Sequence, residues 1–107
     1  GLTEAEAIKS GFAPISEFIW GLPVARQLSK GEKLGLKMTA DRSTGRLLGA
    51  QCVAHEGAVK RIDTLAVALW NDMDVREVGY LDLAYSPFYG GAWDPIHIAA
   101  QNIARKL

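Results

Sequence analysis

The chain of 107 residues has the length of one domain and leaves no room for two separate hydrophobic cores. Twelve basic residues balance twelve acidic ones, so the net charge points to neither nucleic acid, nor an anionic membrane, nor a polyanionic substrate. Hydrophobic residues make up 49% of the sequence, which supplies a core, and no apolar run approaches the roughly 20 residues that span a bilayer.

Cys52 is the only cysteine, which excludes an intrachain disulfide, a redox-active cysteine pair and a cysteine-rich zinc site. A single cysteine is typical of a reducing compartment, so we expect a cytoplasmic protein. The sequence begins with "GLTEAEA" and enters a helix cap at once, with neither an initiator methionine nor a signal segment. We therefore expect residues 1–107 to be a single domain cut from a longer protein.

A short helix is expected at residues 3–10, because Thr3 followed by Glu6 is the capping-box pattern. The next segment, residues 12–20, is rich in Phe, Ile and Trp, which favours a strand. Pro14 cannot donate the backbone hydrogen bond that a central strand requires, so we place it at a sheet edge or at the beginning of the strand.

Residues 33–54 carry the clearest pattern, that of an antiparallel hairpin. Apolar and polar residues alternate on both sides of the turn sequence "DRSTGR", which is the period of strands with one buried face. The apolar positions are Leu34, Leu36, Met38 and Ala40 before the turn, and Leu48, Ala50, Cys52 and Ala54 after it. This placement predicts that Cys52 is a small buried thiol rather than an activated nucleophile.

Residues 57–70 change to a helical period. We expect one apolar stripe facing the sheet, with Lys60 and Arg61 solvated or ion-paired elsewhere. The stripe consists of Val59, Ile62, Ala66 and Leu69. Val67, Ala68 and Trp70 widen the apolar arc beyond what one sheet face requires, which suggests a second surface to bury against, such as another subunit.

Two further helices are expected near the end of the chain. Asp74 can cap a short one, and Asp94 with Pro95 has the N-cap and first-position pattern of a longer one. On this last helix His97 is predicted to face solvent. The order of elements predicts an α+β fold in which helices cover one face of an antiparallel sheet.

The usual signatures of a self-contained enzyme are missing. The sequence has no nucleotide-binding glycine motif, and His55 and His97 lack the spacing of metal ligands, so no metal site is expected. In "YGGAW", residues 89–93, the two glycines are interpreted as a close approach of backbone to its packing partners rather than as a phosphate cradle, because no strand precedes them.

Asp63 lies among apolar residues of the expected helix 57–70. A carboxylate in such a position must either be buried with a partner or face an interface. A structural ion pair with an Arg or Lys is the main interpretation, and a catalytic role is the alternative.

Two segments of this chain resemble the C-terminal dimerisation domain of pyridine nucleotide-disulfide oxidoreductases. They are "EGAVKRIDTLAVAL" at residues 56–69 and "LDLAYSPFYGGAWDPIHIAAQNI" at residues 81–103. The hairpin sequence "TADRSTGRLLGAQCVAHEG" resembles the same domain, so the resemblance extends over nearly the whole chain. It is greatest to the branch of NADH oxidases and coenzyme A disulfide reductases.

The resemblance implies an FAD-dependent NAD(P)H oxidoreductase whose FAD and nicotinamide domains precede this one. Residues 1–107 would then hold no cofactor by themselves and would lack a complete active site. Proteins of this family are homodimers in which the C-terminal domains pair two subunits across a two-fold axis. The loop 84–95 is accordingly expected to reach the flavin and the redox cysteine of the partner subunit.

Tyr85 is the residue to which the resemblance assigns chemistry. Disulfide reductases in general place a His-Pro pair in this loop, but the related branch has a tyrosine at the position of Tyr85 instead. We expect Tyr85 to donate a proton or a hydrogen bond to a thiolate or a reduced intermediate. Alternatively, its hydroxyl only anchors the loop. Tyr89 and Trp93, together with Asp63, are expected at the subunit interface, where aromatic residues are enriched.

Coenzyme A disulfide reductases carry another tyrosine before the second strand, where this chain has residues 27–30 without one. This departure argues against coenzyme A disulfide as the substrate and leaves NADH oxidation with another acceptor open. The electron acceptor and the choice between NADH and NADPH would be set in the preceding domains, so this sequence does not indicate them. A rival interpretation is a free-standing homodimeric interaction module without redox partner domains. A small autonomous enzyme is not supported, because nucleophile, base and cofactor motifs are all missing.

Overall fold

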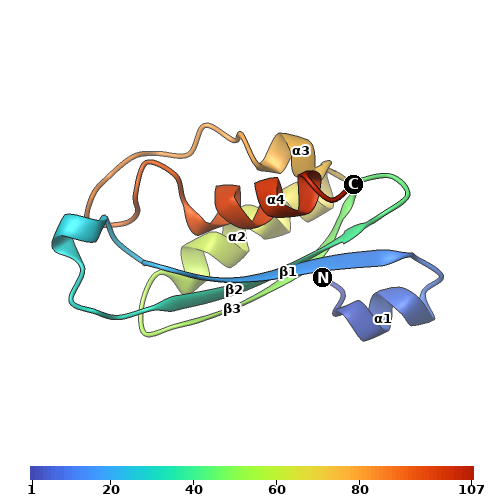
Figure 1. Cartoon of the computed structure of the whole chain (residues 1–107), viewed down its shortest axis with the longest axis horizontal. Coiled ribbons are helices and arrows are strands. Elements are labelled where there is room, and N and C mark those ends of the chain that lie inside the picture. Colours follow the sequence, from blue (N-terminus) through green and yellow to red (C-terminus); the bar gives the residue numbers. More distant parts are fainter.

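The computed structural model describes all 107 residues and consists of one three-stranded sheet, four α-helices and a 3₁₀ turn (Figure 1). In chain order the elements are α1 (Glu4–Lys9), β1 (Pro14–Gly21), η1 (Arg26–Leu28), β2 (Leu34–Asp41), β3 (Leu47–Ala54), α2 (Ala58–Trp70), α3 (Val75–Val78) and α4 (Pro95–Ala104). The predicted α+β class and the predicted hairpin are thereby confirmed, and Pro14 opens an edge strand as expected.

The sheet has the order β1-β2-β3 and is antiparallel throughout. The central strand β2 buries one complete row of side chains, Leu34, Leu36, Met38 and Ala40, none of which has exposed surface. This alternation is the one visible in the sequence, since successive strand residues point to opposite faces. The core is therefore built on one face of the sheet.

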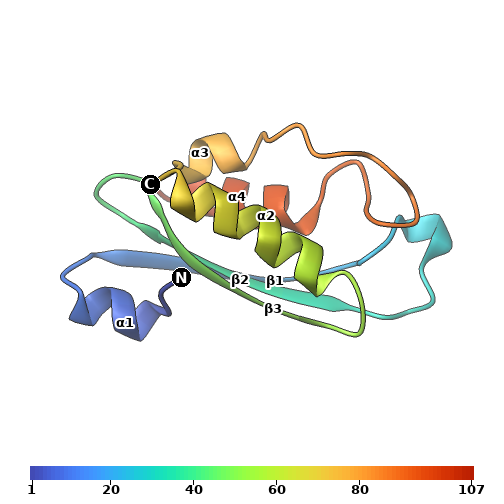
Figure 2. The ribbon, with the colours of Figure 1, turned by 180° about the vertical axis from the view of Figure 1, so that it is seen from behind.

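Helices α2 and α4 cover that face side by side, as Figures 1 and 2 show from opposite directions. They contribute Leu65 and Ala68 from α2 and Ile96 and Ile103 from α4 to the core. The short helix α1 lies on the other side of the sheet, near one end of it (Figure 1). Helix α3 packs against α4 and adds Val75 and Val78 to the same core. The helices that cover the core face are therefore α2, α3 and α4.

Local signals place the ends of the helices. Thr3 and Glu6 form the predicted capping box of α1, and Asp74 accepts a hydrogen bond from the backbone of α3. Asp94 caps α4, with Pro95 in the first helical position. Each cap satisfies backbone N–H groups that have no partner within the helix.

The face that α2 turns toward the sheet differs from the predicted one. Its fully buried side chains are Arg61, Leu65 and Ala68, whereas Val59 is 74% exposed. The prediction was wrong because α2 is apolar on both sides, so its period did not indicate which side packs. Arg61 can turn inward because a carboxylate partner is buried with it, as described below.

No helix of this structure is long and apolar enough to cross a membrane, and the longest, α2, has 13 residues. About 20 consecutive apolar residues are required for a spanning helix.

Asp41 organises the turn between β2 and β3. Its carboxylate accepts hydrogen bonds from the Thr44 hydroxyl at 2.9 Å and from the backbone N–H groups of Ser43 and Ala13, each at 3.4 Å. The Thr44 hydroxyl above all, and then these two N–H groups, hold the pKa of Asp41 below its usual value.

A carboxyl group whose pKa is lowered by folding stabilises the protein above the ordinary aspartate pKa of about 4 and loses this effect as the pH falls. We expect Asp41→Asn to lower the free energy of unfolding at pH 7 and to flatten its decline between about pH 5 and pH 2. Urea unfolding at several pH values measures both effects. Asp82→Asn, at an exposed aspartate, is the control, and equal pH slopes for the two variants would contradict the assignment.

Candidate functional site

The loop that connects the short helix α3 to α4 crosses the end of the molecule at which η1 also lies (Figure 1). Its backbone is held at several points. The carbonyl of Pro87 accepts from the N–H of Ala25 at 2.8 Å, and the carbonyl of Ser86 accepts from the N–H groups of Tyr89 and Gly90 at 2.8 and 3.0 Å. The aromatic loop of residues 84–94 is therefore an ordered turn.

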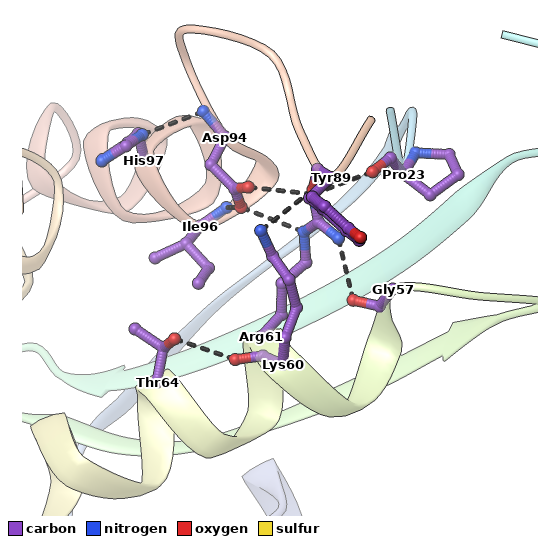
Figure 3. Close-up of polar contacts among 9 residues, drawn as sticks. All are labelled: Pro23, Gly57, Lys60, Arg61, Thr64, Tyr89, Asp94, Ile96 and His97. Carbon is purple, nitrogen blue, oxygen red and sulfur yellow. Dashed lines mark hydrogen bonds and ion pairs between the residues drawn. The ribbon is translucent and has the colours of Figure 1, made fainter. Parts of the chain in front are cut away.

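Arg61 lies beneath this loop and has no exposed surface. From the first turns of α2 its side chain points toward the start of α4 (Figure 3). The guanidinium donates from Nε to Asp94 Oδ1 at 3.0 Å and from Nη2 to Asp94 Oδ2 at 2.9 Å. This two-point geometry matches the planar fork of arginine to the carboxylate.

The remaining N–H groups of Arg61 donate to main-chain carbonyls. Nη1 donates to Gly57 at 2.8 Å, and Nη2 also donates to Tyr89 at 3.3 Å and to Pro23 at 3.4 Å. Arg61 and its four partners, Asp94, Pro23, Gly57 and Tyr89, are called the Arg61 cluster (Figure 3). The cluster joins the segment after β1, the start of α2, the aromatic loop and the start of α4.

His97 is buried, contrary to the prediction that it faces solvent. Its Nδ1 accepts a hydrogen bond from the backbone N–H of Asp94 at 2.9 Å, and its Nε2 lies 2.7 Å from the carbonyl of Leu81. Since a carbonyl only accepts, Nε2 carries the hydrogen. His97 thus completes the cap of α4 and fixes the chain that leads into the loop.

Gly90 lies against the ion pair. A Cβ atom at this position would be 3.1 Å from Asp94 Oδ2 and 3.4 Å from Arg61 Nη2. This close approach confirms the interpretation of the glycine pair for Gly90, whereas a Cβ atom at Gly91 would meet only the carbonyl of Trp93 at 3.7 Å, an ordinary contact. No buried side-chain nitrogen or oxygen in the structure is left without a partner, so the cluster is internally satisfied.

The side chains of the three predicted site residues in the loop are largely exposed. Tyr85 is 60% exposed, Tyr89 66% and Trp93 58%. Trp93 packs edge-on against the rings of Tyr80 and His97, with centroids 6.2 and 5.5 Å apart. None of the hydrogen bonds that hold the loop involves the Tyr85 hydroxyl, so the structure lends no support to an anchoring role for it.

Asp63 lies on the outer side of α2 and is exposed, and it forms no ion pair within the chain. The predicted intrachain partner is therefore missing, and its place at an interface stays a prediction. The residue that the sequence interpretation underestimated is Arg61. Arg61 precedes Leu65 by four residues and Ala68 by seven, so it lies on the same side of the helix as they do. This spacing was the signal in the sequence that Arg61 shares their burial.

Cys52 points from β3 into the covered face, opposite Leu36. Burial raises the pKa of its thiol, and the nearby Arg61 opposes this only in part. The thiol is therefore held protonated, as expected of a structural cysteine. No three His, Cys, Asp or Glu side chains gather into a group that could hold a metal ion.

An open groove of about 670 Å³ lies beside the loop. Its lining combines the rings of Trp20 and Trp93 with the cations Arg26 and Lys33, and no carboxylate lines it. The groove therefore suits a ligand or a protein segment with both apolar and anionic parts.

These features define an α+β domain that presents an ordered aromatic loop and an apolar helix face to its surroundings, as an interface domain does. The family model of the pyridine nucleotide-disulphide oxidoreductase dimerisation domain matches residues 1–95. The chain therefore belongs to this family and is its dimerisation domain, which confirms the resemblance.

Relatives of this chain are reductases and oxidases. The NAD(P)H sulfur oxidoreductase (CoA-dependent) of Pyrococcus abyssi is 36% identical over 101 residues, which cover 94% of this chain and 22% of that protein. Coenzyme A disulfide reductase of Staphylococcus aureus strain JH9 is 38% identical over 65 residues, which cover 61% of this chain and 15% of that protein. The chain spans about a fifth of the length of the first curated relatives it matches.

A solved structure with the same fold is the NAD-dependent persulfide reductase from A. fulgidus. It superposes with a TM-score of 0.93 and 29% sequence identity, over 99% of this chain and 20% of that one. The two layers of sheet and helices described above thus match one part of that longer protein.

Removal of Arg61 should cost more stability than removal of a surface arginine. Arg61→Met leaves Asp94 buried without its partner, which typically costs about 3–5 kcal/mol. Arg46→Met breaks the ion pair with Asp72 on the surface and should cost at most about 1 kcal/mol. Urea unfolding of both variants at pH 7 gives the comparison. Equal losses for the two variants would contradict a buried, obligatory pair.

Proposed function

We propose that this chain pairs two subunits of an FAD-dependent NAD(P)H oxidoreductase of the NADH oxidase or disulfide reductase type. In this proposal its loop 84–95 reaches the flavin site of the partner subunit and completes it. The observation that carries the proposal is the contrast within the loop, whose backbone is fixed by the Arg61 cluster while Tyr85 points outward unbonded. Ordered, exposed aromatic residues are typical of surfaces that bind a partner.

The outer face of α2 supports the pairing role. Val59, Ala66, Val67 and Trp70 lie on this side of the helix and are exposed, with Trp70 at 89%. Asp63 is the one charged residue among them. Exposed apolar stripes of this kind mark association surfaces, and the family is defined by a dimerisation domain, so we assign this face to a second copy of the chain.

Tyr85 supports the completing role. A phenol hydroxyl that no group of its own chain engages is free to donate a proton or a hydrogen bond to a thiolate across the interface. Tyr89 and Trp93 would bury area around it. The relatives named as sulfur oxidoreductase and disulfide reductase favour a sulfur-containing electron acceptor for the parent enzyme.

FAD and NAD(P)H would be held by the other domains of the parent enzyme, because this chain spans only about a fifth of its relatives. When bound there, they supply the electrons of the reaction. The contribution of this chain is limited to pairing the subunits and delivering the loop. The single cysteine further leads us to place the enzyme in the cytoplasm.

The pairing role predicts that the chain is a dimer in solution, with a mass near twice 11.6 kDa. We expect Trp70→Ala to weaken the dimer at least about tenfold, since a buried tryptophan is a common energetic centre of interfaces. Phe18→Ala, at a half-exposed aromatic residue of β1 that does not line the groove, is the control. Light scattering over a range of concentrations gives the dissociation constants. The assignment of this face would be contradicted if the unsubstituted 107-residue chain were a monomer, or if both substitutions changed the dissociation constant equally.

The completing role predicts that Tyr85→Phe in the full-length enzyme lowers kcat about a hundredfold, because general acid catalysis contributes at least that much. The KM for NAD(P)H should not change, since the nicotinamide would bind in another domain. Tyr80→Phe, at an exposed tyrosine outside the loop, is the control. Unchanged turnover and an unchanged pH profile for Tyr85→Phe would instead favour a pairing module without a role in catalysis.

A further inference from the structure

The start of α2 holds the aromatic loop at two points, the main-chain carbonyl of Tyr89 and the carboxylate of Asp94. The carbonyl of Tyr89 accepts from Lys60 Nζ at 2.9 Å and from Arg61 Nη2 at 3.3 Å. Two residues earlier, the carbonyl of Pro87 is held by the N–H of Ala25. Figure 3 shows Lys60 and Arg61 pointing from adjacent positions of α2 toward the same carbonyl.

We propose that Arg61 and Lys60 are positioning residues for Tyr85. This inference rests on the proposed role of Tyr85 at the partner's site. The same helix carries, on its outer side, the apolar stripe that includes Val59 and Trp70. One rigid element therefore sets both the subunit interface and the place of the loop, so the reach of Tyr85 into the partner is fixed by the pairing geometry.

The physical basis is the number and the direction of the bonds. A main-chain carbonyl cannot turn away from its donor unless the loop backbone moves, so two cations on one oxygen restrict the backbone itself. Asp94 restrains the other end of the loop through the same guanidinium. Tyr85 precedes these points and is connected to them through its neighbour Ser86, whose carbonyl accepts from the N–H groups of Tyr89 and Gly90. The side chain of Tyr85 remains exposed and free to contact a partner.

Amide hydrogen exchange of the 107-residue chain tests the positioning. In Arg61→Lys, one ammonium cannot replace the arginine fork, so the amides of Tyr89 and Gly90 should exchange at least about tenfold faster. Lys60→Met keeps the Arg61 pair, and it should accelerate the same amides about threefold while those of β2 remain unchanged. Lys60→Arg keeps a cation at this position, so the amides should exchange at the rates of the unsubstituted chain. Lys106→Met, at another exposed lysine, should leave the exchange rates of the loop amides unchanged.

A double-mutant cycle in the full-length enzyme tests whether the positioning acts through Tyr85. Lys60→Met should lower kcat severalfold at constant KM for NAD(P)H, and it should have no further effect in a Tyr85→Phe background. An equal effect in both backgrounds would overturn the inference, as would loop amides that exchange at parent rates in Lys60→Met and Arg61→Lys. If Tyr85→Phe alone leaves kcat unchanged, the proposed role of the loop in the partner's site fails while the pairing role stands, and the exchange rates still decide whether the loop is positioned by these residues.

Discussion

The bidentate pair of Arg61 and Asp94 is the interaction on which the arrangement of the aromatic loop and the segments around it depends. Burying two charges costs several kcal/mol per ion, and their attraction offsets this only if the remaining hydrogen-bonding groups are also satisfied. Here the carbonyls of Pro23, Gly57 and Tyr89 complete the shell. An apolar pair of equal volume could stabilise the core as well, but it would not dictate which carbonyls approach. The directional bonds of the arginine therefore determine how the segments meet.

Helix α2 is unusual in that both of its sides have a role. Its inner side packs Leu65 and Ala68 on the sheet and directs Arg61 to the loop, while its outer side exposes Val67 and Trp70. Within a single subunit, a helix with two apolar sides that packs on one sheet buries only one of them. In the proposed pairing a further copy of the chain covers the second side, which agrees with a chain that belongs to a family of dimerisation domains.

The sequence was sufficient to predict the parts of the fold that rest on local patterns. The caps at Thr3, Asp74 and Asp94 and the alternation of β2 each have a strict spacing, and all of them appear as expected. In β3 the alternation holds for Ala50, Cys52 and Ala54, but a register shift places Leu47 in the core instead of the predicted Leu48. The inner side of α2 was not predictable from its period, because the deciding partner of Arg61 lies 33 residues away. The burial of His97 had a signal that was overlooked, since it follows Asp94 by the same three residues that separate Glu6 from Thr3.

The contrast between a fixed backbone and free side chains also explains why an exposed aromatic loop is compatible with tight association. Binding must offset the conformational entropy that a flexible loop loses when it is ordered. In this chain the hydrogen bonds to Pro87, Ser86 and Tyr89 have ordered the loop already during folding. A partner surface that covers Tyr85 and Trp93 therefore gains their buried area while restricting only a few side-chain rotations. The entropy lost on ordering the loop is thus offset during the folding of the single subunit, by the backbone hydrogen bonds of the loop together with the Arg61 cluster.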